Sequence, residues 1–156
     1  MRRTFFVPFV AAALVVPAAL ARPAFTGNVC SLLTAKQVAV VHVPSKCTPS
    51  TTAGSASTLD YGSWGTTTGP HLSLTVNSFK STSAAFQLAK KYLGQIPNAK
   101  KVSGIGSVAW ESRQGNTTTI NFVVGHDTCN LGLVTAKPLT SFAPAVALAK
   151  AIAAQL

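Results

Sequence analysis

Between residues 108 and 133 the chain reads Val-Ala-Trp-Glu-Ser-Arg-Gln-Gly-Asn-Thr-Thr-Thr-Ile-Asn-Phe-Val-Val-Gly-His-Asp-Thr-Cys-Asn-Leu-Gly-Leu. Three short runs in this stretch alternate apolar with polar residues, which predicts strands that each bury one face. The side chains expected to face the core are Val108 and Trp110, then Ile120, Phe122 and Val124, then Cys129, Leu131 and Leu133. Turn residues separate the runs at 114–116 and 125–127. The stretch is therefore predicted to form an antiparallel meander.

A hairpin is predicted upstream of the meander. Residues 59–64 form its first strand, and Leu72, Leu74 and Val76 alternate with polar residues in its second. A Gly- and Pro-containing segment at 65–70 supplies the turn. Residues 48–58 show no period and are rich in Ser and Thr, so they are expected to form a mobile loop.

A short helix is predicted before the hairpin. Thr34 and Gln37 have the spacing of a capping box, which predicts a helix from Ala35 to about His42. Pro44 is expected to end it.

Longer helices are expected after the hairpin and after the meander. The first covers residues 83–93, with Lys90 and Lys91 turned outward. Its inward-facing residues are expected to be Phe86, Ala89 and Leu93. The last helix begins after Ser141, with Pro144 in its first turn, and runs toward the end of the chain.

These elements have the order α-β-β-α-β-β-β-α. They predict an α+β fold with a single antiparallel sheet of about five strands and about three helices on one face. Residues 30–156 are expected to form one globular domain, because this length supports one hydrophobic core and is too short for two.

The first 21 residues have the composition of a secretory signal peptide. Arg2 and Arg3 precede an apolar run, and Ala19-Leu-Ala21 forms a small-x-small cleavage site. Cleavage is predicted between Ala21 and Arg22, which leaves a short N-terminal segment, residues 22–29, ahead of the domain. The protein is therefore expected to be secreted or extracytoplasmic, either released or wall-associated, with no transmembrane anchor after cleavage.

An oxidising compartment permits a disulfide among the three cysteines. Cys30 and Cys47 lie on either side of the first predicted helix, whereas Cys129 alternates with core leucines. The favoured pairing is therefore Cys30–Cys47 with Cys129 buried, and Cys47–Cys129 is the alternative.

The chain carries a formal net charge of +10, with 13 basic and 3 acidic residues. Outside the membrane, such a balance favours an anionic envelope component or another exported protein as partner, and nucleic acid is not expected. The lysine pairs Lys90, Lys91 and Lys100, Lys101 are candidates for an anion-binding patch. Tyr61 and Trp64, with Phe79 and Trp110, are candidates for a sugar or apolar ligand, although burial is the commoner outcome for such aromatics.

Little in the sequence indicates a catalytic site or a cofactor-binding motif. Gly104-Ile-Gly106 has the spacing of a dinucleotide-binding turn, but a strand rather than a helix is expected after it. The acidic residues are only Asp60, Glu111 and Asp127, too few for most carboxylate chemistry. The histidines, His42, His71 and His126, lack ligand spacing, so neither a metal nor a cofactor is expected.

The hypothesis that follows is an exported, non-enzymatic binding or interaction domain at the bacterial cell envelope. One alternative is an envelope hydrolase that uses a histidine, and another is a structural wall-associated protein. The oligomeric state does not follow from these patterns.

Three segments carry a family resemblance: Cys30-Ser-Leu-Leu-Thr-Ala-Lys-Gln-Val38, Ser103-Gly-Ile-Gly-Ser-Val-Ala109 and Ala147-Leu-Ala-Lys150. With these the chain resembles a family of small exported bacterial domains of unknown function, found in actinobacterial secreted proteins and lipoproteins. The resemblance implies an α+β sheet domain outside the membrane, with a cap-and-disulfide region around Cys30 and Cys47. A looser similarity to extracytoplasmic sensor domains of bacterial receptor kinases favours binding or sensing by analogy.

Overall fold

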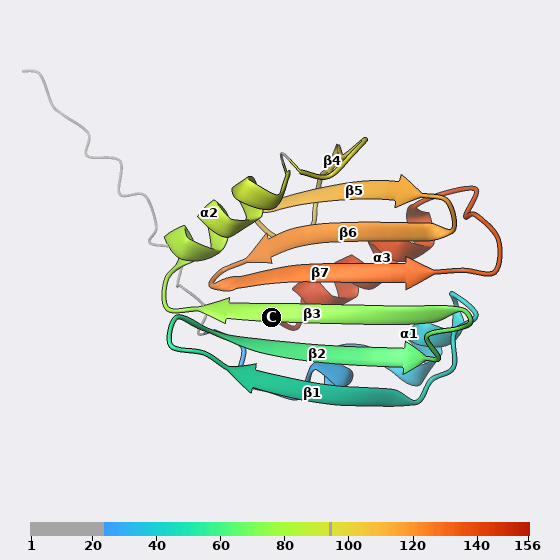
Figure 1. Ribbon diagram of the computed structural model, residues 1–156, viewed down its shortest axis with the longest axis horizontal. Coiled ribbons are helices and arrows are strands. Elements are labelled where there is room, and N and C mark those ends of the chain that lie inside the picture. The colour runs from blue at the N-terminus through green and yellow to red at the C-terminus, as the bar shows by residue number, and fades with distance from the viewer. Residues whose placement is uncertain (1–23, 94) are drawn as a thin grey trace, which may run out of the picture.

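Seven strands form one antiparallel sheet in the computed structural model, which describes residues 24–93 and 95–156 (Figure 1). The strand order across the sheet is β1-β2-β3-β7-β6-β5-β4. The strands are β1 (Cys47–Ala53), β2 (Ser57–Gly65), β3 (His71–Phe79), β4 (Lys100–Val102), β5 (Val108–Gln114), β6 (Thr117–Val124) and β7 (Asp127–Val134). A 3-10 helix η1 (Val29–Leu32) and the helices α1 (Ala35–Ala39), α2 (Thr82–Leu93) and α3 (Ala143–Ala153) complete the described part. The predicted α+β class and single antiparallel sheet are confirmed.

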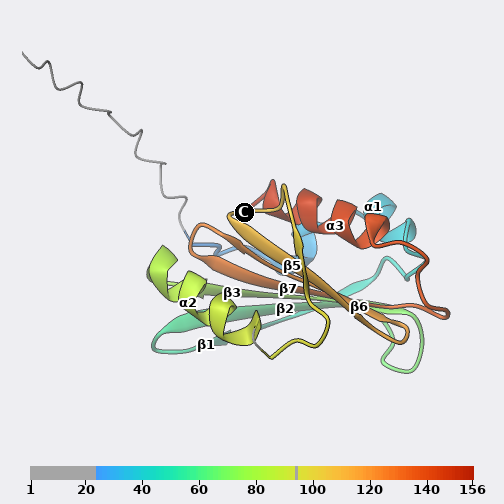
Figure 2. The ribbon, with the colours of Figure 1, turned by 90° about the horizontal axis from the view of Figure 1, so that it is seen from above.

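The helices lie on both faces of the sheet, and the prediction that they share one face is wrong. Figure 2 shows α1 and α3 on one side of the strands and α2 on the other. Helix α3 contacts β6 and β7 on one face of the sheet, whereas α2 contacts β3, β6 and β7 on the opposite face. The periodicity of a helix reveals which of its own sides is apolar but not which face of the sheet it covers.

The main core fills the space between the sheet and the layer formed by η1, α1 and α3. Its fully buried members include Leu72, Leu74 and Val76 of β3, Ile120 and Phe122 of β6, Leu131 and Leu133 of β7, and Ala149 and Ile152 of α3. Each large apolar side chain buried in this way contributes about 1.5–3 kcal/mol to folding. The apolar side chains of β3, β6 and β7 therefore face the core, as the alternation in these strands predicts.

Two edge strands were not predicted, and the sheet has seven strands rather than about five for that reason. Residues 48–58, expected to be a mobile loop, instead form most of β1 and the start of β2. β1 is exposed along almost its whole length, so it has no apolar alternation to detect, and Pro49 is tolerated because the strand is at an edge. At the opposite edge β4 has only three residues, and exposed Lys100 and Lys101 protect it from pairing with another chain.

In two further elements, β5 and α2, some of the residues predicted to face the core are wrong. In β5, Ala109 is fully buried opposite Phe122, whereas Val108 and Trp110 are only half-buried on the other face. Apolar residues occupy both faces of β5, so the alternation alone predicts the wrong face of this strand to be buried. In α2, Phe86 is 44 % exposed, whereas Ala85 is fully buried and Ala89 is half-buried. The side chain of Leu93 lies outside the described part.

The predicted capping box is present at the start of α1. The Thr34 amide donates to Gln37 Oε1 at 2.8 Å, and the Gln37 amide donates to Thr34 Oγ1 at 3.3 Å. The helix is shorter than predicted, because it ends at Ala39 and the chain turns through His42 at a φ of +57°. At α3, the Ser141 hydroxyl accepts from the Ala143 amide at 3.1 Å, one residue before the cap position.

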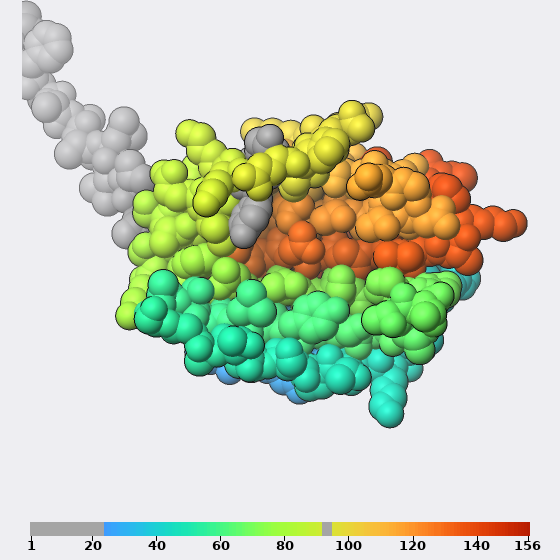
Figure 3. All heavy atoms as spheres, in the orientation of Figure 1, coloured from blue at the N-terminus to red at the C-terminus, as the bar shows by residue number. Residues whose placement is uncertain are grey.

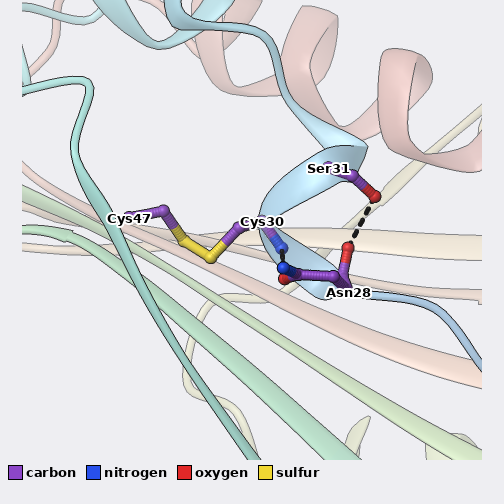
Figure 4. The surroundings of a disulfide bond; sticks show 4 residues. All are labelled: Asn28, Cys30, Ser31 and Cys47. Atoms are coloured by element: carbon purple, nitrogen blue, oxygen red, sulfur yellow. Dashed lines mark hydrogen bonds between the residues drawn. A yellow bond between two sulfur atoms is a disulfide. The ribbon is translucent and has the colours of Figure 1, made fainter.

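A disulfide joins Cys30 of η1 to Cys47 of β1, which confirms the favoured pairing (Figure 4). Asn28 fixes the turn that presents Cys30, since its side chain accepts from the Cys30 amide at 2.9 Å and its carbonyl from Ser31 Oγ at 2.6 Å. Cys129 is free and buried, which excludes the alternative pairing. The bridge spans 17 residues and therefore contributes about 3 kcal/mol by limiting the unfolded chain.

The predicted signal peptide, residues 1–21, and its cleavage site between Ala21 and Arg22 lie outside the described residues. The description begins at Ala24, and Phe25 is held on the sheet by its backbone. Its amide donates to both carboxylate oxygens of Asp127 at 3.2 Å, and its carbonyl accepts from Ser78 Oγ at 3.2 Å. In residues 24–93 and 95–156, none of the helices has the length and apolar character needed to cross a bilayer.

Candidate functional site: the open face of the sheet

The sheet face opposite α3, here called the open face, is polar. Because side chains alternate along a strand, directly paired residues in adjacent strands lie on the same face. One such set crosses the whole sheet and is called the central row. From β1 to β4 it consists of Ser50, Tyr61, Thr75, Asn130, Asn121, Trp110 and Lys101. An aromatic residue therefore lies toward each end of the row, with hydroxyl and amide side chains between them.

A pair of amides forms the middle of the central row. Asn130 Nδ2 donates to Asn121 Oδ1 at 2.6 Å across β7 and β6. This bond uses one donor and one acceptor, so the pair still has Asn130 Oδ1 and the Asn121 amide group to offer. Two planar groups held together in this way present fixed acceptors and donors toward the space above the sheet.

The row on one side of the central row carries only hydroxyls and a glycine. Its members are Thr48, Ser63, Ser73, Gly132, Thr119 and Ser112. Gly132 leaves room for its neighbour, because a Cβ at this position would stand 2.7 Å from Ser73 Oγ. The open face therefore stays flat and hydroxyl-rich here.

The row on the other side passes beneath α2. Its members are Thr52, Leu59, Asn77, Thr128, Val123 and Val108. Among the described residues, Asn77 Oδ1 has no hydrogen-bond partner, and it is buried out of reach of solvent. An unsatisfied buried acceptor of this kind costs about 1–3 kcal/mol.

A cavity of about 640 Å³ lies between these rows and α2. Its floor includes Thr75, Asn77, Thr119, Asn121, Thr128 and Asn130. Leu88 and Ala89 of α2, with Ile96 and Pro97 of the following segment, contribute apolar surface above the strands. Figure 3 shows the open face toward the viewer, with α2 and the residues that lead into β4 raised above the strands. Leu59 of β2 adds apolar surface on the strand side, and Gln95 and Asn98 add amides after α2, so the cavity combines polar and apolar groups.

The described lining of the cavity presents no charged side chain to it. Arg113 is the one charged residue among those lining residues, and its guanidinium lies 4.4 Å from the ring centre of Phe142, beside α3 on the other face. Lys90 and Lys91 are exposed at the end of α2, and Lys100 and Lys101 are exposed on β4. The positive charge therefore lies around the cavity rather than inside it.

The aromatic candidates are divided between the two faces. Tyr61 lies in the central row, but Trp64 is 1 % exposed on the core side of β2, so it is not available to a ligand. Trp110, for which burial was the commoner expectation, is half-buried on the open face. Tyr61 and Trp64 are thus not brought together, whereas Tyr61 and Trp110 share one row.

Sequence reasoning missed the polar centre of the site, namely Thr75, Asn77, Asn121 and Asn130. A signal for it was present, since asparagine is depleted in strands. Here three asparagines occupy outward positions of three neighbouring strands, β3, β6 and β7.

The histidines and aspartates are engaged elsewhere. His71 Nδ1 lies 2.8 Å from the Gly69 carbonyl oxygen, and His126 Nδ1 lies 3.3 Å from that of Phe79. Asp60 is buried and accepts from Thr51 Oγ1 at 2.6 Å. Burial raises the pKa of Asp127 above its ordinary value, although the hydrogen bond from the Phe25 amide opposes the shift.

In residues 24–93 and 95–156 no group of three or more His, Cys, Asp or Glu side chains is placed to hold a metal ion. Gly104 to Ser107 lead directly into β5, so no helix follows the glycines to bind a pyrophosphate. No protein-family model matches this chain, and no curated protein matches it significantly in sequence.

Proposed function

We propose that this protein is an exported, non-enzymatic binding protein of the bacterial cell envelope, and that it binds its ligand on the open face beneath α2. The observation that carries the proposal is the cavity of about 640 Å³, which is lined by amides, hydroxyls and apolar side chains together. Its volume falls within the range of small-molecule sites, about 300–1,000 Å³. The export part rests on the signal-peptide composition of residues 1–21 and agrees with the disulfide.

The groups in the cavity favour binding over the alternative of a histidine-dependent hydrolase. A general base must reach the reacting proton within hydrogen-bond distance. The described lining offers Asn, Thr, Ser and Gln side chains, which donate and accept hydrogen bonds but do not take up protons at neutral pH. His71 and His126 are directed to backbone carbonyls outside this lining.

We propose that an anionic component of the envelope is the surface to which the protein is attracted. The exposed lysines Lys90, Lys91, Lys100 and Lys101 lie on α2 and β4, next to the cavity rather than within it. We propose that they attract the protein to a negatively charged surface, while the cavity binds an uncharged part of the ligand. Attraction of this kind weakens when the screening length falls from about 30 Å in 0.01 M salt to about 3 Å in 1 M salt.

Cosedimentation with purified bacterial envelope tests the proposal. The full chain, expressed in an exporting bacterial host and purified, should sediment with envelope, and Asn121→Ala with Asn130→Ala should lower the bound fraction at least fivefold. Thr67→Ala, in the exposed β2–β3 turn, is the matched control and should bind like the wild type. Envelope binding that is unchanged in the double variant would contradict the proposed site.

The lysines are tested in the same assay. A variant with Lys90, Lys91, Lys100 and Lys101 changed to Gln should lose most of the salt-dependent part of binding. Binding that does not respond to salt in either protein would contradict the electrostatic part of the proposal.

A further inference from the structure

We infer that the ligand is a neutral glycan, a chain of pyranose sugars lying across the strands along the central row. This inference rests on the proposed function and adds the chemical class of the ligand. Its basis is the order of side chains in the row, the pitch of the row and the lack of charged side chains on the cavity floor.

The order of side chains suits a sugar chain. Tyr61 and Trp110 are half-buried on the open face toward opposite ends of the row. Both lie outside the described lining of the cavity, which includes Thr75, Asn130 and Asn121 between them. The axial C–H groups of a pyranose form an apolar patch that packs on an aromatic ring, while the ring's N–H or O–H remains free to hydrogen-bond. Between the aromatics, Thr75, Asn130 and Asn121 face the sugar hydroxyls with both donors and acceptors.

The pitch of the row fits an extended glycan. Neighbouring strands lie about 4.8 Å apart. A β-1,4-linked pyranose in an extended chain advances by a slightly longer step. β2 and β5 are separated by β3, β7 and β6 in the sheet. The four intervals between Tyr61 and Trp110 therefore span about 19 Å, so each successive ring would lie above a different strand.

The cavity's electrostatics select a neutral chain. A phosphate or carboxylate placed on the floor between Tyr61 and Trp110 would meet amides and hydroxyls, because the cation of the row, Lys101, lies beyond Trp110 on β4. The anion would lose hydration there without compensation. An uncharged sugar loses less hydration free energy, because its hydroxyls can replace hydrogen bonds to water with hydrogen bonds to Asn and Thr side chains.

An extended peptide is the competing ligand, and the geometry disfavours it. Peptides in extended form are usually recognised through the free backbone groups of an edge strand. The central row instead crosses the middle of the sheet, where the strands' backbone groups are paired with one another. Recognition here must come from side chains, which suits a hydroxyl-rich ligand.

Isothermal titration tests the inference, with uncharged β-1,4-linked N-acetylglucosamine oligomers of increasing length and β-1,4-linked glucose oligomers as a second series. Affinity should rise with length and level off once the chain spans Tyr61 to Trp110. Tyr61→Ala and Trp110→Ala should each weaken binding of the longest oligomer about tenfold. Tyr61→Phe and Trp110→Phe keep an aromatic ring and should stay within about threefold, which separates stacking from a folding defect.

The two proposals fail in different ways. If neither oligomer series binds, or a neutral Ser- and Gly-rich peptide binds instead, the glycan inference is overturned. The proposed function survives that result when envelope binding still depends on Asn121 and Asn130. If envelope binding ignores those asparagines, the site itself is wrong and both proposals are overturned.

Discussion

Asn121 and Asn130 lie opposite each other on β6 and β7, and their side chains are joined by a 2.6 Å hydrogen bond on the open face of the sheet. The bond joins two exposed or half-exposed polar groups in the middle of a polar row, above a core that continues on the other face without them. The pair therefore contributes little to the core.

Removing this pair should leave stability almost unchanged. Exposed hydrogen bonds contribute about 0.5–1.5 kcal/mol net, so Asn121→Ala and Asn130→Ala should each lower the free energy of unfolding by about 1 kcal/mol or less. Ile120→Ala is the matched comparison in the same strand, and its loss of a buried side chain should cost about 2–5 kcal/mol. Urea unfolding measures both, and equal losses would show that the pair is structural.

The disulfide arrangement predicts the number of reactive thiols. Burial raises the pKa of the Cys129 thiol well above its ordinary value, so the native protein should show no thiol that reacts rapidly with a thiol reagent. Denaturation without reductant should expose one thiol, and reduction should expose all three. Mass mapping of the labelled peptide should identify Cys129. A label found on Cys30 or Cys47 before reduction would refute the pairing.

Reduction also tests how much the bridge stabilises the fold. Cys30→Ala combined with Cys47→Ala removes the constraint on a 17-residue separation and should lower the free energy of unfolding by about 3 kcal/mol. Thermal unfolding of the double variant and of the reduced wild type should agree. If neither differs from the oxidised wild type, the bridge has no stabilising role.

Asp127 predicts a pH dependence of stability. Its pKa is raised in the folded state, chiefly by burial, so the folded protein binds a proton more tightly than the unfolded chain does. Stability should therefore fall as the pH rises from the unfolded carboxyl pKa, about 4, through the raised folded value. Asp127→Asn removes this titration while keeping an acceptor for the Phe25 amide. Urea unfolding across this pH window should show a shallower decline in the variant, and parallel curves would contradict the assignment.

Two glycines with similar backbone angles should differ sharply in their response to substitution. Gly106 has a φ of +53° and Gly115 a φ of +58°, so alanine at either site carries left-handed strain of about 1–2 kcal/mol. At Gly106 an added Cβ would also overlap the Val123 carbonyl oxygen, whereas at Gly115 it would meet nothing within 4 Å. Gly106→Ala should therefore be several kcal/mol more destabilising than Gly115→Ala in chemical denaturation. Similar losses of stability in the two variants would mean that the backbone at Gly106 does not lie close to the Val123 carbonyl oxygen of β6.

Local patterns predicted much of the fold because each was set by neighbouring residues. The Thr34–Gln37 capping box depends on a three-residue spacing, and the β3 and β7 alternations follow from one buried face. β1 was missed because an edge strand exposed along almost its whole length needs no apolar residues. Trp110 was assigned to the core because its strand has apolar residues on both faces, and only pairing of Ala109 with Phe122 decides which face is buried.

The candidate site was predicted only at its periphery. Tyr61 and the lysines were recognisable by residue type, but the central row exists only through the register of seven strands. Asn121 and Asn130 are nine residues apart and meet because the β6–β7 turn sets their pairing. Register depends on turn geometry and on which face is buried, so the row could not be assembled from the sequence.

The fluorescence of Trp110 tests the central claim, glycan binding on the open face, most directly. The chain has two tryptophans, and Trp64 is 1 % exposed in the core, so a ligand on the open face should change the emission of Trp110 alone. Titration with the longest neutral oligomer that binds should shift the wild-type emission to shorter wavelength, because a sugar over the indole displaces water. Trp110→Phe should bind by calorimetry but show no shift. A ligand that binds the wild type with measurable heat yet leaves its emission unchanged would place the site away from the central row.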